Sequence, residues 1–263
     1  MTDETQAPRT AVVIPAAGRG VRLGPGTPKA LRALHGTPML VHAVRAMAAS
    51  RAVSLVVVVA PPDGLAEVQA MVDDHLHPTE GPSFAPARAG EETDIRVVAG
   101  GETRQESVRR GLDALPDDVT AVLVHDAARP LVPVEIVDGV VEAVRAGAPA
   151  VVPGLPLSDT VKEVGPLAEG ASGPGEPVVA TPERARLRAV QTPQGFDRES
   201  LDRAHRQGPV EGEGATDDAG LCERLGLPVV VVPGHEEAFK VTRPLDLVLA
   251  EAVLARRRAN DGY

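Results

Sequence analysis

The chain has 263 residues, of which 27 are basic and 37 acidic, for a formal net charge of −10. Its length suits one large α/β domain, and a hydrophobic content of 43% excludes a wholly disordered chain. The acidic balance argues against nucleic-acid binding, and a single cysteine, Cys222, excludes a disulfide framework and a cysteine-based zinc site. The apolar runs are far shorter than the ~20 residues that span a bilayer. A polar, acidic start without a signal-peptide pattern predicts a cytoplasmic protein with no membrane partner.

Short valine-rich runs alternate with helical patterns along the chain. The predicted strands are 10–15, 54–60, 95–99, 121–125, 150–153 and 229–232. The predicted helices are 37–50, 63–76, 103–115, 133–146 and 244–258. Thr37 is expected to cap the first helix with Pro38 at its first position, and Thr103 with Glu106 forms a capping box. This alternation predicts a doubly wound, mostly parallel α/β sheet in a single domain over 1–263.

Residues 158–190 interrupt this alternation. Two short strand-like pieces enclose a Gly/Pro-rich segment there, which predicts a projecting β-hairpin arm. An exposed hairpin of this size needs a surface to pack on, and a second subunit is the simplest candidate. The sequence therefore predicts a homodimer formed through the arm.

The first predicted strand leads into a glycine-rich, cationic loop, PAAGRGVRLGPGTPK, at 15–29. Backbone amides of such a loop approach phosphates closely, and Arg22 and Lys29 add positive charge, so the loop predicts an anionic ligand. A dinucleotide fingerprint does not fit, because the next acidic residue is Asp63, beyond the expected spacing of ~20 residues. A Walker A loop does not fit either, since Lys29 follows Pro28. The alternative is an ordinary turn with solvated basic side chains.

The loops at 99–107 and 125–130 also follow predicted strands, so all three loops are expected to converge on one crevice. Asp126 comes directly after the fourth strand, where a carboxylate suits Mg²⁺ bound with phosphates; a turn-stabilising Asp is the alternative. Ser107 is placed to bond a base edge, or else is a helix-surface serine. For Asp217 and Asp218 a second metal pair is less favoured than a helix start, with Thr216 as N-cap and the acids favouring the helix dipole.

Seven motifs occur in one order along the chain. They are the loop at 15–29, GGETRQESV at 100–108, VHDAARP at 124–130, DTVK at 159–162, QTPQ at 191–194, TDDA at 216–219 and KVTRPLDL at 240–247. Together they resemble the 2-C-methyl-D-erythritol 4-phosphate cytidylyltransferase family over about 10–255. The resemblance implies a Rossmann-like nucleotidyltransferase that transfers CMP from CTP to 2-C-methyl-D-erythritol 4-phosphate and releases pyrophosphate, with Mg²⁺ or another divalent cation.

The resemblance also implies roles for individual residues. Nucleotide binding falls to Pro15, Ala16, Ala17, Gly18, Gly20, Gly101, Arg104 and Ser107, with Ala16, Gly101 and Ser107 reading cytosine. Substrate binding falls to Ala127, Arg129, Thr160, Thr192 and Thr216, and the metal to Asp126. The catalytic cations are Arg22, Lys29, Arg184 and Lys240. Arg184 would reach from the arm to the neighbour's substrate; Arg186 replaces it if the motif spacing contains a gap, and a solvated basic strand is the plain alternative.

Two other functions stay open from the sequence alone. A cytidylyltransferase for another polyol phosphate, such as ribitol 5-phosphate, shares most of these motifs. A catalytically silent nucleotide-binding protein would keep the loop without the reaction, although every charged position that the chemistry needs is occupied here.

Overall fold

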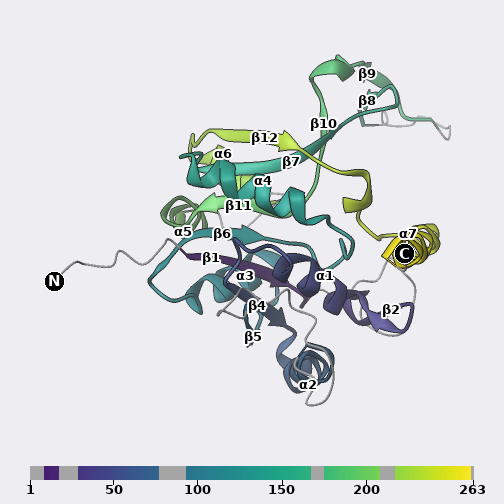
Figure 1. The fold of residues 1–263 in the computed structure, drawn as a ribbon. Helices are drawn as coiled ribbons and strands as arrows, with labels where there is room; N and C mark the ends of the chain where they lie inside the picture. The colour runs from purple at the N-terminus through teal and green to yellow at the C-terminus, as the bar shows by residue number, and fades with distance from the viewer. Residues whose placement is uncertain (1–8, 18–28, 77–92, 167–174, 208–216, 262–263) are drawn as a thin grey trace.

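A computed structural model describes residues 9–17, 29–76, 93–166, 175–207 and 217–261. Among these residues an eight-stranded sheet forms the centre of the molecule (Figure 1). Its strands are β1 Arg9–Pro15, β4 Leu55–Ala60, β5 Asp94–Ala99, β6 Val119–Val124, β7 Ala150–Pro156, β10 Arg188–Val190, β11 Gln194–Asp197 and β12 Val229–Pro233. They lie in the order β10-β7-β11-β6-β1-β4-β5, and β12 pairs with β7.

The sheet is mostly parallel, as predicted. β1 pairs in parallel with β4 and β6, β4 with β5, and β12 with β7. β11 is inserted antiparallel between β6 and β7, and β10 pairs antiparallel with the end of β7. The sequence patterns predict neither of these two short strands.

Helices cover both faces of the sheet, which confirms the doubly wound arrangement (Figure 1). The helices are α1 Met39–Ala48, α2 Leu65–Leu76, α3 Arg104–Asp113, α4 Val134–Arg145, α5 Arg198–Gln207, α6 Asp218–Arg224 and α7 Pro244–Asp261. α1, α2 and α4 pack with Val12 and Ile14 of β1, while α3, α5 and α6 pack with Ala11 and Val13. Side chains of a strand alternate between the two faces of the sheet, so a continuous apolar strand contributes to the core on each face.

The close approach of α3 to the sheet depends on Gly111. A Cβ at this position would lie 2.5 Å from Cγ1 of Val13 and 3.0 Å from Cγ2 of Val59. The absence of a side chain therefore lets the helix lie against β1 and β4, and this seats the N-terminus of α3 beside the carboxyl ends of those strands.

The C-terminal helix has its own small core. Leu254, Val253 and Ala250 of α7 pack with Leu34, Met39, Leu131 and Val241. Leu34 belongs to a short hairpin of β2 Ala33–Leu34 and β3 Thr37–Pro38. This hairpin corrects one prediction: Thr37 pairs in a strand and does not cap α1, whose N-cap is Pro38 without a side-chain hydrogen bond. Thr103 caps α3 as predicted, accepting from the backbone N–H of Glu106, while the Glu106 carboxylate reaches back to the N–H of Glu102.

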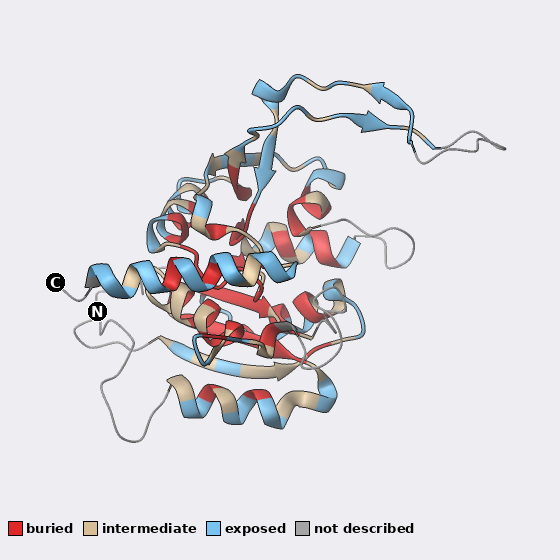
Figure 2. Cartoon of the chain, turned by 90° about the vertical axis from the view of Figure 1, so that its right-hand side faces the viewer, coloured by how far each residue is buried: buried red, intermediate tan, exposed pale blue. Residues whose placement is uncertain are grey.

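The arm extends away from the sheet, as predicted. β8 Glu163–Val164 pairs antiparallel with β9 Val178–Ala180, and a 3-10 turn, η4 Arg184–Arg186, leads back to β10. Figures 1 and 2 show this hairpin standing clear of the body, and nearly all of its described residues are exposed. Within the described ranges, no helix is long and apolar enough to cross a membrane.

Candidate functional site

Three strand ends meet at one edge of the sheet and enclose a cavity of about 170 Å³. Pro15 and Ala17 follow β1, Gly101 follows β5, and Asp126 follows β6. Arg104 and Ser107 of α3 complete the part of the wall that the sequence predicts. The predicted convergence of the strand-end loops is therefore observed for the described residues.

The turn between β5 and α3 is built by the hydroxyl of Ser107. This buried group donates to the carbonyl of Thr103 at 2.9 Å and accepts from the N–H of Gly101 at 3.1 Å. A hydroxyl has one donor and two lone pairs, so one acceptor position is left for a ligand in the cavity. Ser107 therefore shapes the pocket wall, and its contact with a base stays a prediction.

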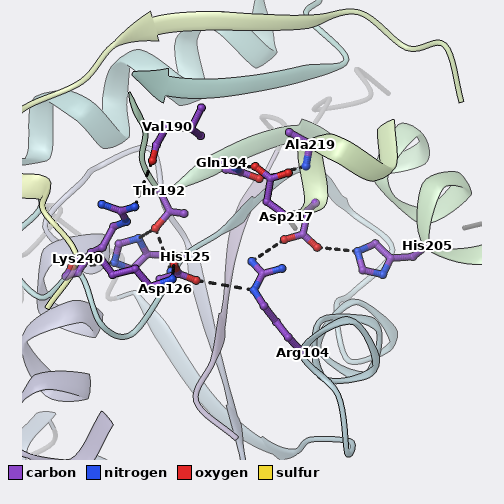
Figure 3. A network of polar contacts seen from close by, with 12 residues as sticks. Arg104, His125, Asp126, Val190, Thr192, Gln194, His205, Asp217, Ala219 and Lys240 are labelled. Carbon is purple, nitrogen blue, oxygen red and sulfur yellow. Dashed lines mark hydrogen bonds and ion pairs between the residues drawn. The ribbon is translucent and has the colours of Figure 1, made fainter. Parts of the chain in front are cut away.

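Asp126 is the centre of charge at this edge. Its Oδ2 lies 2.6 Å from Nζ of Lys240, and its Oδ1 lies 3.8 Å from Nε of Arg104 (Figure 3). Burial acts to raise the pKa of Asp126, but Lys240, Arg104 and Arg129 outweigh it and lower the pKa to about 2. The carboxylate is thus ionised near neutral pH and faces the cavity between two cations.

The backbone of Asp126 is fixed by a chain of buried hydrogen bonds. Its N–H donates to Oγ1 of Thr192 at 3.0 Å, and this hydroxyl lies 3.1 Å from Nδ1 of His125. Burial lowers the pKa of His125 to about 4, so the imidazole is neutral near pH 7. Its Nε2 donates to the carbonyl of Arg129 at 3.1 Å, which leaves Nδ1 to accept from Thr192. The Thr192 hydroxyl therefore already donates one hydrogen bond and accepts another inside the protein.

Arg129 and Lys240 are brought together by backbone contacts. Nη1 of Arg129 donates to the carbonyl of Ala238 at 2.7 Å, and Nη2 donates to that of Val190 at 3.3 Å. The N–H of Val241 donates to the carbonyl of Ala128 at 2.8 Å. These bonds tie the segment that carries Lys240 to the loop after β6, next to buried Ala127.

The two acids at the start of α6 correct the sequence interpretation. The N-cap is Asp217, which accepts from the N–H of Gly220 at 2.9 Å, and not Thr216. Asp218 lies in the first turn of α6, as expected. It is also buried, and its carboxylate contacts Nε2 of His205 at 3.0 Å and Nη2 of Arg104 at 2.7 Å. Sequence patterns give no signal for this pairing, because the partners lie on three separate helices.

The predicted residues of the arm lie apart from the cavity wall. Arg184 donates to the carbonyl of Ser158, and Thr160 is exposed. Arg186, its alternative, is exposed on the same 3-10 turn. The arm therefore does not complete the site formed by the described residues of its own chain.

Several predicted residues cannot be placed. Gly18, Gly20, Arg22 and Thr216 lie outside the described residues, and so does the side chain of Lys29, whose backbone opens η2 Lys29–Leu31. Cys222 of α6 is buried in the core, as expected, and burial raises the pKa of its thiol to about 12.

Comparison with known proteins agrees with the geometry. The profile of the family 2-C-methyl-D-erythritol 4-phosphate cytidylyltransferase (IspD) matches residues 10–256. Proteins of that name from Streptomyces avermitilis and Streptomyces coelicolor are 71% and 72% identical over 97% of this chain, covering 95% and 88% of their own lengths. The crystal structure of 2-C-methyl-D-erythritol 4-phosphate cytidylyltransferase from Thermus thermophilus is 36% identical, with a TM-score of 0.65 and coverage of 93% of this chain and 98% of that one. The chain belongs to the 2-C-methyl-D-erythritol 4-phosphate cytidylyltransferase family.

Proposed function

We infer that this chain is a cytidylyltransferase that transfers CMP from CTP to 2-C-methyl-D-erythritol 4-phosphate and releases pyrophosphate. The observation that carries the inference is the ionised Asp126, held between Lys240 and Arg104 on the wall of a cavity at the carboxyl edge of the sheet. Its membership of the family and the high identity to relatives of that name support the same activity.

The reaction depends more on electrostatic stabilisation of phosphate charge than on a general base. A phosphate oxygen of the alcohol substrate attacks the α-phosphorus of CTP in line, and the bond from that phosphorus to the β-phosphate bridge oxygen breaks. Pyrophosphate leaves with the bonding electrons. A phosphate monoester is largely dianionic near pH 7, so the attacking oxygen needs no strong base. Positioning and electrostatic stabilisation therefore carry most of the catalysis.

The residues divide between the two ends of this reaction. At the nucleotide end, the wall formed by Gly101 and Ser107 accepts the base, and Arg22 and Lys29 stabilise charge on the α-phosphate and the leaving group. At the alcohol phosphate, Lys240 and Arg129 supply positive charge from within the chain. Thr160, Thr192 and Thr216 stay predicted substrate residues, although the Thr192 hydroxyl already donates to His125 and accepts from the N–H of Asp126.

Asp126 fits a divalent cation. Mg²⁺ is usually held by one or two carboxylates together with substrate phosphates, and Asp126 is an ionised carboxylate beside the nucleotide cavity. Among the side chains that the structure describes, no group of three or more His, Cys, Asp or Glu could hold a metal by itself, so phosphate oxygens would have to complete the set. When bound, the ion would neutralise phosphate charge, and Asp126 would hold it there.

The test is a pyrophosphate-release assay with each of the four nucleoside triphosphates and 2-C-methyl-D-erythritol 4-phosphate. We expect release with CTP and little with the others. Equal or faster turnover with ribitol 5-phosphate would favour the other polyol phosphate. Binding of CTP without pyrophosphate release, with Mg²⁺ present, would favour a silent nucleotide-binding protein.

The arm supports a homodimer in which one copy completes the site of the other through Arg184. Val164, Val178 and Val179 are 45%, 56% and 60% exposed on the hairpin. Exposed apolar side chains grouped in this way are typical of a surface that binds another protein. A cytoplasmic location stays an expectation that cell fractionation would check.

Complementation tests the exchange of Arg184. In a mixed dimer of Arg184→Ala and Lys240→Met chains, one of the two sites has both residues intact. With free exchange, the mixture should recover about a quarter of wild-type activity, although each variant alone is nearly inactive. No recovery after demonstrated exchange of subunits would contradict a role for Arg184 in the neighbouring site.

A further inference from the structure

Arg104 joins two carboxylates that come from different parts of the fold. It is the first residue of α3, and its Nη2 lies 2.7 Å from Oδ2 of Asp218. Its Nε lies 3.8 Å from Oδ1 of Asp126 (Figure 3). Asp126 belongs to the reacting edge, whereas Asp218 is not used by the mechanism above. The guanidinium therefore connects the cavity wall to a buried acid behind it.

The buried acid is itself held from a second side. Oδ1 of Asp218 lies 3.0 Å from Nε2 of His205, and both side chains are almost completely inaccessible to solvent. Removing a carboxylate from water is costly unless charged and hydrogen-bonded partners compensate it. Here Arg104 supplies the charge and His205 supplies the hydrogen bond, so these three residues form one unit (Arg104–Asp218–His205).

Helix α6 does not need Asp218 for its own start. Asp217 caps the helix through the N–H of Gly220, and Gln194 holds both Oδ2 of Asp217, at 2.6 Å, and the N–H of Ala219, at 3.1 Å. The start of the helix is thus fixed by Gln194 and Asp217, and the charge of Asp218 is directed at Arg104 instead.

We propose that Asp218, supported by His205, is a positioning residue that holds the guanidinium of Arg104 in the nucleotide cavity. The Arg104 side chain is 38% exposed and would otherwise lose side-chain rotamer entropy on ordering when a nucleotide binds. The ion pair with buried Asp218 orders the Arg104 side chain before a nucleotide binds, so less rotamer entropy is lost on binding. The proposal rests on the proposed function, because it assigns Arg104 to the CTP side of that reaction.

The test compares two neighbouring Asp→Asn changes. Asp218→Asn removes the charge beside Arg104 with little change of shape. It should lower kcat/KM for CTP by about 10- to 100-fold, mostly through KM, with KM for the alcohol phosphate nearly unchanged. Asp217→Asn is the matched control, since Asn caps helices as well as Asp does and Asp217 acts on Arg104 only as a weaker through-space charge, whereas Asp218 forms the ion pair. Its kcat/KM should stay within about threefold of wild type.

A double-mutant cycle separates positioning from a merely structural role. If Asp218 acts through Arg104, then Asp218→Asn should have almost no further effect on kcat/KM in an Arg104→Gln background. Additive effects, or wild-type kcat/KM in Asp218→Asn, would overturn the proposal. Wild-type release of pyrophosphate from CTP is measured first, so failure of the proposed function is recognised separately.

His205→Gln provides a second route if Asp218→Asn does not fold. It leaves the Arg104–Asp218 ion pair in place and removes the imidazole that supports it. The expected result is a smaller rise in KM for CTP, of about threefold to tenfold, which disappears in the Arg104→Gln background. An equal loss in both backgrounds would show that His205 supports only the fold, and would contradict the positioning role.

Discussion

The carboxyl edge of the sheet and the arm both carry predicted site residues, but their surroundings differ. The Asp126 side chain is 15% exposed and has two cations and a buried hydrogen-bond chain around it. On the arm, Val178 and Val179 are more than half exposed, and Lys162 contacts an exposed Thr181. The edge is therefore preorganised within one chain, whereas the arm presents groups whose burial requires another molecule.

This difference shows which predicted site residues find their contacts within a single chain. The ion pairs of Asp126 with Lys240 and Arg104 are complete within one chain. For Arg184 and Thr160, one chain gives position but no reacting partner. Matched substitutions in the two regions can test this contrast.

The largest contrast is expected between two lysines. Lys240→Met removes the ammonium 2.6 Å from Asp126 and should lower turnover by about 10²–10³-fold, as loss of one group aimed at developing charge does in other enzymes. Lys162→Met removes an arm ammonium that contacts Oγ1 of Thr181, and turnover should stay within about fivefold. Steady-state kinetics on folded samples measures both. Similar losses in the two variants would break the contrast.

A pair of threonines comes next. Thr192→Val keeps the shape but leaves the N–H of Asp126 and Nδ1 of His125 without their partner, so it should destabilise the fold by about 2 kcal/mol or more. Thr160→Val changes an exposed side chain of the arm and should shift stability by less than about 0.5 kcal/mol. Chemical denaturation gives both values. If Thr192→Val is as stable as wild type, the buried chain does not hold the loop after β6.

The carboxyl edge could be predicted from sequence because its signals are local. Continuous apolar runs such as β4 show which strands are buried, and Asp126 and Gly101 follow strands directly. Once strands are parallel, their carboxyl ends share one edge, and the convergence follows. The arm could also be predicted, because two short strand-like pieces enclose a Gly/Pro-rich segment within residues 158–190.

The buried polar links could not be predicted in the same way. β11, Gln194–Asp197, contains one large apolar residue, Phe196, and α5 is amphipathic but also has one large apolar residue, Leu201, so neither forms an apolar run that stands out in the sequence. Arg104 lies far along the chain from His205 and Asp218, which are 13 residues apart, and contact between the three depends on how three helices pack. The helix dipole already accounts for an acid in the first turn of α6, so the sequence contains no sign of the further tertiary contacts of Asp218.

A single valine tests whether the exposed surface of the arm is an interface. Val179 is 60% exposed on the arm and Val248 is 62% exposed on α7, so Val179→Ser and Val248→Ser are matched in exposure. If the arm is buried in a dimer, Val179→Ser should raise the dimer dissociation constant by about tenfold, because the methyl groups leave an apolar contact. Val248→Ser should not. Sedimentation over a dilution series measures both, and equal constants would contradict an arm interface.

The smallest expected effect concerns the support behind Lys240. Glu237 accepts from Nε of Arg257 at 2.8 Å, and Nη2 of Arg257 donates to the carbonyl of Leu131, which ties η5 Glu236–Ala238 to α7. Burial acts to raise the pKa of Glu237, but hydrogen bonds and charge from Arg257 and Arg256 lower it overall. Glu237→Gln should therefore reduce the free energy of unfolding by about 1 kcal/mol at neutral pH.

The pH dependence of this loss has a fixed sign. Because the pKa of Glu237 is lower in the folded chain than in the unfolded chain, its contribution is complete above the unfolded value and disappears as the pH falls through the folded value. The stability difference between wild type and Glu237→Gln should thus narrow from neutral pH to about pH 3. Urea denaturation at both pH values measures it. A stability difference that stays constant with pH would mean that the Glu237 side chain acts through packing alone. The segment carrying Lys240 would then be held by the hydrogen bonds that Arg129 and Val241 donate to backbone carbonyls, without help from the charge of Glu237.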